Sequence, residues 1–191
     1  MSHLDCQSRA NESSSLRILP AYVKAIWPLM TLILMIPPIQ ASAHLRASLL
    51  LRLTGEVLEC ITGYMASGSD LMELMDMLEE LDNGWMAVLC SETWDSKSRV
   101  GVRLPPNAEF LSPPISQTDR TRLRSLLISG TDKLELWLDE LAMQQWDKRI
   151  EEFVPGETVM EEQVLEITEV KERLDGVFRT ALFHLTISDM E

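Results

Sequence analysis

The stretch HLRASLLLRLTGEVLECITG, residues 44–63, decides the fold. Apolar side chains recur in it every fourth residue, at Leu45, Leu49, Leu53, Val57 and Ile61, with Leu50 and Leu58 beside them. Charged side chains take the other face, at Arg46, Arg52, Glu56 and Glu59. This repeat is typical of an amphipathic α-helix, and it predicts one that ends at Gly63.

Three further segments, 69–92, 117–147 and 158–187, carry the same kind of apolar stripe. Capping signals stand near their starts: Ser69 or Asp70 for the first, Ser116 with Asp119 for the second, and Thr158 with Glu161 for the third. With residues 44–63 they predict an all-α fold, a helical bundle of about four long antiparallel helices.

Three glycines fall inside these predicted helices, at Gly84, Gly130 and Gly176. Each follows Asn, Ser or Asp, and such pairs are common in turns. The stripe of residues 69–92 runs straight through Gly84, which favours a continuous helix there. If all three sites break their helices, the bundle has six or seven shorter helices instead of four.

Residues 94–117 show no helical period and contain Pro105-Pro106 and Pro113-Pro114. We expect one long Pro-rich loop here and no β-strand in the chain. Irregular segments of this length within a compact domain are usually functional, so the loop is a candidate docking or regulatory segment.

The N-terminal part of the chain is open to several interpretations. Residues 1–16 form a polar tail that we expect to be disordered. Within 17–43, the apolar run 25–36 is followed by Pro37-Pro38 and the small residues 41–43. It fits a signal peptide cleaved after Ala43, a membrane anchor, or an extra buried helix. Residues 44–191 are then a single acidic helical domain.

Charge narrows the choice of partners. The chain has 191 residues and a net charge of −13. The charge lies after residue 43, since residues 1–43 have three basic and two acidic side chains. An acidic body repels nucleic acid, so we expect no nucleic-acid binding and favour protein partners that are helical or basic-faced. A membrane contact is expected only if residues 25–36 act as an anchor.

The three cysteines are too few for a disulfide scaffold. Cys60 and Cys90 fall on predicted helices near apolar residues, so the simplest expectation is two buried thiols. In a secreted protein they could instead pair with each other. The sequence slightly favours a cytoplasmic or nuclear location over the secretory pathway, without deciding the compartment.

No stretch of the sequence carries a recognisable catalytic pattern. Phosphate-binding glycine loops, the nucleophile elbow and Cys or His metal-ligand spacings are all missing from the sequence. We therefore expect no catalytic residues, no metal, no cofactor and no enzymatic activity. An enzyme that uses carboxylates alone is the alternative, and it would require buried acids with raised pKa values.

Two groups of residues are candidates for contacts with a partner. Arg120, Arg122 and Arg124 cluster at the predicted start of a helix, where backbone N–H groups favour anions, so they could hold an anion or a partner. Trp94 and Trp146, near helix ends, and Met72 and Met77, beside an apolar stripe, could anchor a partner helix. Packing in the core, or pairing with acids, explains the same residues without any partner.

These features favour a non-enzymatic helical interaction module, a subunit or adaptor of an intracellular complex. The alternative is a secreted or lumenal helical protein with a cleaved signal ending at Ala43. A sheet in the fold, or a cavity where ionisable groups converge on a bound small molecule, would count against the first hypothesis.

Overall fold

The computed structural model describes residues 18–39, 42–104, 115–151 and 160–187, without the side chains of 145–151 and 160–167. In chain order the elements are α2 (Leu19–Leu34), α3 (Ala43–Cys60), the 3-10 turn η1 (Ile61–Gly63), α4 (Gly68–Leu89), strands β1 (Thr93–Asp95) and β2 (Val100–Val102), α5 (Gln117–Glu151), α6 (Met160–Gly176) and α7 (Arg179–Ile187). The described part is mostly helical, which confirms the predicted all-α class.

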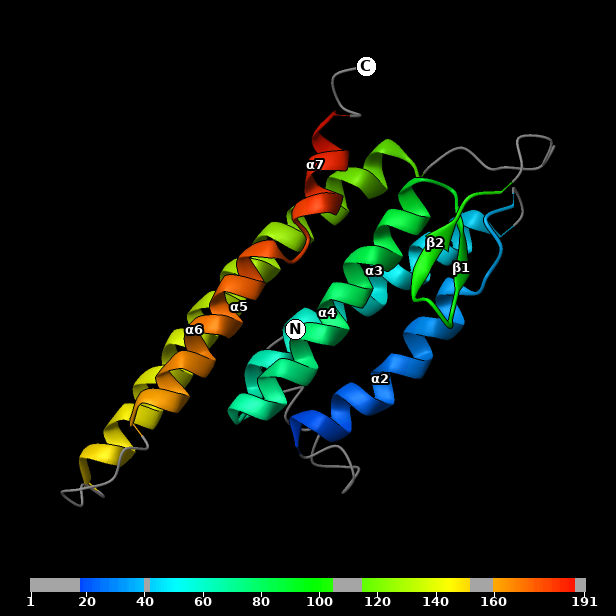
Figure 1. Ribbon diagram of the computed structural model, residues 1–191. Helices are drawn as coiled ribbons and strands as arrows, with labels where there is room; N and C mark the ends of the chain where they lie inside the picture. Colours follow the sequence, from blue (N-terminus) through cyan, green and yellow to red (C-terminus); the bar gives the residue numbers. More distant parts are fainter. Residues whose placement is uncertain (1–17, 40–41, 105–114, 152–159, 188–191) are drawn as a thin grey trace.

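Helix α4 lies in the middle of the fold. It packs against α2 and α3 on one side and against α6 and α7 on the other, while α5 packs against α3, α6 and α7. Figure 1 shows α2 at one edge of the molecule and the long α5–α6 pair at the opposite edge. A simple bundle of four long helices is not confirmed, because α2 adds a helix to the core and the last predicted helix is divided.

The apolar stripes of α4 and α5 point into the core as predicted. The eight apolar stripe residues of α4 are all buried: Leu71, Leu74, Met75, Leu78, Leu81, Trp85, Val88 and Leu89. The α5 stripe is buried from Leu123 to Leu141. A long apolar stripe opposite a polar face can be buried in only one rotation of the helix, so the helical period alone predicts the orientation of these two helices correctly.

The first turns of α3 are rotated relative to the prediction. Leu45 and Leu49 are 52% and 37% exposed, whereas Arg46, predicted for the polar face, is only 1% exposed. Ala47 and Leu50 face the core in their place. Leu50 and Leu53 satisfy a helical period as well as Leu49 and Leu53 do, so the sequence left the orientation of this end undecided.

Two of the three glycines sit inside continuous helices at points of close packing. A Cβ added to Gly84 would lie 2.8 Å from Leu34 of α2, and one added to Gly130 would collide with Leu58 of α3. The prediction of a continuous helix through Gly84 is confirmed. The absence of a side chain lets each pair of helices approach.

The third glycine does mark a break. Helix α6 ends at Gly176 and α7 begins at Arg179, with the buried Phe178 between them in the left-handed region at a φ of 62°. Backbone N–H of Val177 donates to the carbonyls of Arg173 and Leu174, which closes the end of α6. Of the two options that the sequence left for residues 158–187, the break at Gly176 is the one observed.

The expectation of no strand is also wrong. Strands β1 and β2 form an antiparallel hairpin in which Trp94 is paired with Gly101. The turn is held by Asp95, whose carboxylate accepts hydrogen bonds from Ser98 Oγ and Lys97 N. Three-residue strands are too short for an alternating pattern to stand out in sequence. The hairpin packs on α4 and does not form a layer of the core.

Helix caps agree with the predictions in part. Ser116 Oγ accepts from the backbone N–H of Asp119 at the start of α5, as predicted. Helix α4 begins one residue early: Ser67 is its cap, and Ser67 N donates to the Asp70 carboxylate at 2.9 Å. The predicted capping box of Thr158 and Glu161 lies outside the described residues, as do the proline pairs 105–106 and 113–114.

The apolar run 25–36 is largely part of α2, which belongs to the core. The inward face of this helix is buried at Leu19, Tyr22, Val23, Met30, Ile33 and Leu34. It packs against α3 and α4. In this arrangement the segment is a helix packed in the core, and its retention in the mature chain stays a prediction. Within the described residues, no helix is long and apolar enough to cross a membrane.

Candidate functional site

The predicted partner anchors whose side chains the structure describes, Met72, Met77 and Trp94, do not form an exposed surface. Met77 and Trp94 are buried in the core, and Met72 packs partly buried against it. The Met72 sulfur lies 3.8 Å from Arg173 Nη1. Trp146 lies on α5, but its side chain is outside the described residues. Packing therefore accounts for the three anchors whose side chains are described.

The three predicted arginines lie in the first turns of α5 without converging on one point. Arg120 is buried, and Arg124 is half-buried. Arg122 is exposed and lies 3.7 Å from the carboxylate of Asp119. Residues two apart do not face each other on a helix, so Arg122 does not share a face with Arg120 and Arg124, which lie one turn apart.

Cys90 and His184 form the one described contact between a thiol and an imidazole. The expectation of two buried thiols is wrong. Cys60, half-buried at the end of α3, is in a disulfide, whereas Cys90 is exposed and carries a free thiol, so the two are not joined to each other. The Cys90 Sγ lies 3.8 Å from His184 Nε2. Burial of the sulfur, with a further contribution from the Glu92 charge, raises the pKa of the Cys90 thiol. A thiol that resists ionisation is a poor nucleophile, so this pair does not indicate catalysis.

Two acidic side chains of α4 are withdrawn from solvent. Glu80 is 4% exposed, and its carboxylate accepts a 2.6 Å hydrogen bond from Trp27 Nε1 of α2. Arg99 of the hairpin lies 3.4 Å from Glu80 and stacks over the Trp27 ring. Burial raises the pKa of Glu80, against the opposing effects of Trp27 and Arg99. The carboxylate therefore ties α2, α4 and the hairpin together.

The second withdrawn acid, Asp82, accepts a hydrogen bond from the backbone N–H of Ala181 in the first turn of α7. Burial raises its pKa to about 6. Asp82 and Glu80 are two residues apart on α4 and contact different elements, so they do not act as an acid–base pair. Among the described residues, no group of three or more His, Cys, Asp or Glu side chains is placed to hold a metal ion.

A pocket of about 230 Å³ opens between the starts of α3 and α5. Ten residues line it: Pro38, Ala43, His44, Arg46, Ala47, Val88, Ser91, Ile115, Ser116 and Asp119. Sequence reasoning missed Arg46, because it placed this residue on the outer face of its helix. Its position four residues before Leu50 and seven before Leu53 is the signal that could have found it.

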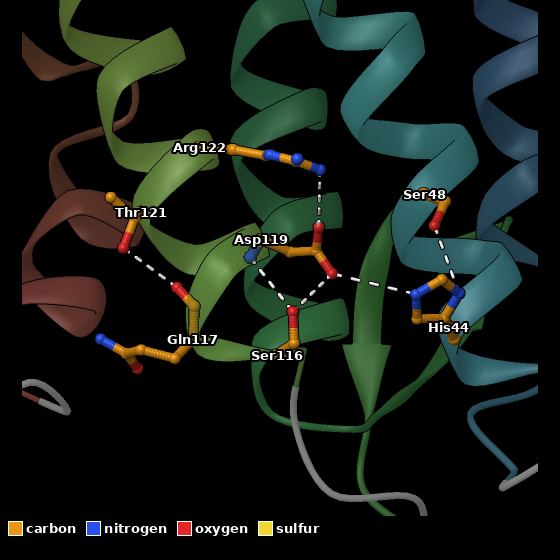
Figure 2. A network of polar contacts seen from close by, with 7 residues as sticks. All are labelled: His44, Ser48, Ser116, Gln117, Asp119, Thr121 and Arg122. Atoms are coloured by element: carbon orange, nitrogen blue, oxygen red, sulfur yellow. Dashed lines mark hydrogen bonds and ion pairs between the residues drawn. The ribbon is translucent and has the colours of Figure 1, made fainter.

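Figure 2 shows a network of polar contacts that includes three residues of the pocket lining, His44, Ser116 and Asp119. The Asp119 carboxylate accepts a 2.7 Å hydrogen bond from Ser116 Oγ and lies 4.0 Å from His44 Nε2. Ser48 Oγ lies 3.4 Å from His44 Nδ1. With Arg122 on its other oxygen, the carboxylate is fully engaged at the start of α5.

The outward face of α2 is an exposed apolar surface. Its exposed large apolar side chains are Leu29 and Leu32 within the helix, the cap residues Ile18 and Met35, and Ile39 beyond the C-terminal end. Ala25 and Pro28 are exposed on the same side. We call this set of seven residues the α2 outer face. The sequence signal for the α2 outer face is that both faces of this helix are almost free of polar residues.

Comparison of the chain with protein-family models, curated proteins and solved structures finds no match.

Proposed function

We propose that this chain is a non-enzymatic helical interaction module, a subunit or adaptor whose α2 outer face binds an apolar-faced helix of a protein partner. The observation that carries the proposal is the exposure of this face, with Leu32 at 66%. Contiguous apolar surface on a globular domain is typical of an interaction site.

The geometry of the face suits a helical partner. Ala25, Pro28, Leu29, Leu32 and Met35 follow the three-to-four-residue spacing of a single stripe along the helix. The opposite stripe of α2 is held in the core by α3 and α4. A rigid apolar ridge of this kind is the surface against which an amphipathic helix lays its own apolar side.

Charge indicates what should surround the contact. Lys24 is the only charged residue of α2, while the chain as a whole has a net charge of −13. A partner can therefore bury the stripe with little desolvation of charge. Basic residues flanking the apolar side of the partner helix would be attracted by the acidic body. The proposed partner is accordingly a basic-flanked amphipathic helix.

The experiment compares Leu32→Asp with Leu136→Asp in the tagged full chain, purified from its native cells. Both leucines are similarly exposed, the second at 64% on α5. We expect Leu32→Asp to reduce recovery of a stoichiometric partner by about tenfold or more, since it places a charge in the centre of the apolar contact. Leu136→Asp should leave recovery unchanged.

Thermal unfolding of both variants provides the control for folding, and neither exposed substitution should change the midpoint appreciably. Equal loss of the partner in both variants would contradict the assignment to α2. Light scattering that shows only a self-associated chain, with no second protein, would contradict the adaptor proposal itself.

A further inference from the structure

We infer that the partner helix on the α2 outer face carries acidic residues along the flank that lies beside the turn between β1 and β2, and its basic residues along the other flank. This inference rests on the proposed function and adds a charge pattern to the partner described there. It follows from the basic side chains that border one side of the α2 outer face.

The basic border lies where the hairpin turn meets α2. The Arg99 Cζ lies 4.8 Å from the centroid of the Trp27 ring, which places the turn beside this helix (Figure 1). Lys24 precedes Trp27 by three residues and Pro28 of the outer face by four, so it lies between them on the helix surface. Lys97 is exposed in the same turn as Arg99. Three cations therefore follow this side of the outer face.

The positive members of the charge pairs at this border are the ones that face solvent. Arg99 is 56% exposed, whereas Glu80, the carboxylate 3.4 Å from it, is 4% exposed. Asp95, the acid of the turn, directs its carboxylate back to Ser98 Oγ and to the backbone N–H of Lys97. A protein that approaches the α2 outer face from solvent therefore meets cations on this side.

This border reverses the sign of charge that prevails in the chain, which has 17 basic and 30 acidic side chains. Acidic residues on the partner are attracted at the border, and basic residues are repelled there. Polar contacts of this kind form the rim around an apolar contact and fix the register of the partner. A helix with one acidic flank can place that flank beside the turn in only one direction, so the border sets the direction in which the partner runs along α2.

The test measures binding of the purified full chain to two synthetic, dye-labelled helical peptides by fluorescence anisotropy. Both peptides have the same apolar stripe, length, composition and net charge. One has glutamate along one flank and lysine along the other, and the second alternates glutamate and lysine on both flanks. We expect the first peptide to bind about threefold more tightly at low salt, and the difference to disappear at about 1 M salt.

Two variants with the same change in net charge locate the effect. Lys24→Glu should abolish the preference for the first peptide, while Arg179→Glu, on the exposed surface of α7, should preserve it. Thermal unfolding checks that both exposed substitutions leave the fold intact.

The outcomes separate this inference from the proposed function. Equal affinity for the two peptides, or a preference that survives Lys24→Glu, would overturn the inference and leave the apolar contact in place. Leu32→Asp should weaken binding of both peptides. Absence of binding, or binding that Leu32→Asp leaves unchanged, would refute the α2 contact itself and the charge pattern with it.

Discussion

Asp82 is a single residue whose protonation is coupled to the packing of α7 on α4. Its carboxylate accepts a hydrogen bond from the N–H of Ala181, and burial raises its pKa from 3.8 to about 6. The folded chain therefore binds this proton more tightly than the unfolded chain does. The stability linked to the protonated group is complete below about pH 4 and is lost as the pH rises through about 6.

Asp82→Asn should remove this part of the pH dependence, since an amide oxygen can still accept from Ala181 N without carrying charge. At about pH 7 we expect the free energy of unfolding to rise by about 1 kcal/mol, a figure reduced for partial solvent exposure. Denaturant unfolding at about pH 4 and about pH 7 measures it. The exposed Asp132→Asn is the control, and an equal gain there would refute the role of Asp82.

Single residues also show where sequence reasoning stops. Trp85 and Trp137 could be assigned to the core from the helical period, and both are buried. For Arg46 the helical period allowed two orientations, and the choice between them depends on the rotation of α3 against α4 and on the carbonyl of Glu92, 46 residues away. Contacts over such separations leave no local pattern in the sequence.

At the scale of elements, Gly130 of α5 and Gly176 of α6 differ in whether the fold has room for a side chain. A Cβ at Gly130 would collide with the buried Leu58, whereas nothing lies within 4 Å of a Cβ at Gly176. Gly130→Ala should lower the free energy of unfolding by about 1–2 kcal/mol, because the overpacking cost exceeds the gain in helix propensity. Gly176→Ala should raise it by about 0.5 kcal/mol. Chemical denaturation of both variants checks the contrast, and the same sign for both would show that packing at Gly130 is misjudged.

The elements themselves were predictable where the apolar stripe is long. Helices α4 and α5 follow from their stripes, with ends that differ from the predicted ones by at most four residues. The division between α6 and α7 was one of two options, and the left-handed Phe178 that makes it has no sequence signature of its own. The β1–β2 hairpin was missed because each strand offers only three residues to a pattern of period two.

At the scale of the whole molecule, the packed core includes α2, so the fold requires residues that precede His44. A protein beginning at His44 would lose the buried Leu19, Val23, Met30 and Leu34, together with the hydrogen bond from Trp27 to Glu80. We therefore expect the chain purified from its native cells to retain α2. Intact-mass analysis tests this, and a mature N-terminus at His44 would contradict it in favour of the cleaved signal.

The sequence could not make this choice, because a short apolar run before small residues fits a signal and a core helix equally well. Our expectation of a core helix comes from packing: Gly84 of α4 leaves room for Leu34 of α2. The same packing leaves Leu29 and Leu32 outside, which is how the α2 outer face arises.

The most direct measurement is photocrosslinking in living cells with a photoreactive amino acid in place of Leu32, compared with the same amino acid in place of Leu136. The proposal predicts a discrete adduct with a second protein from position 32, and none of that adduct from position 136. Adducts only with further copies of this chain, or the same partner adduct from both positions, would contradict the interface on α2.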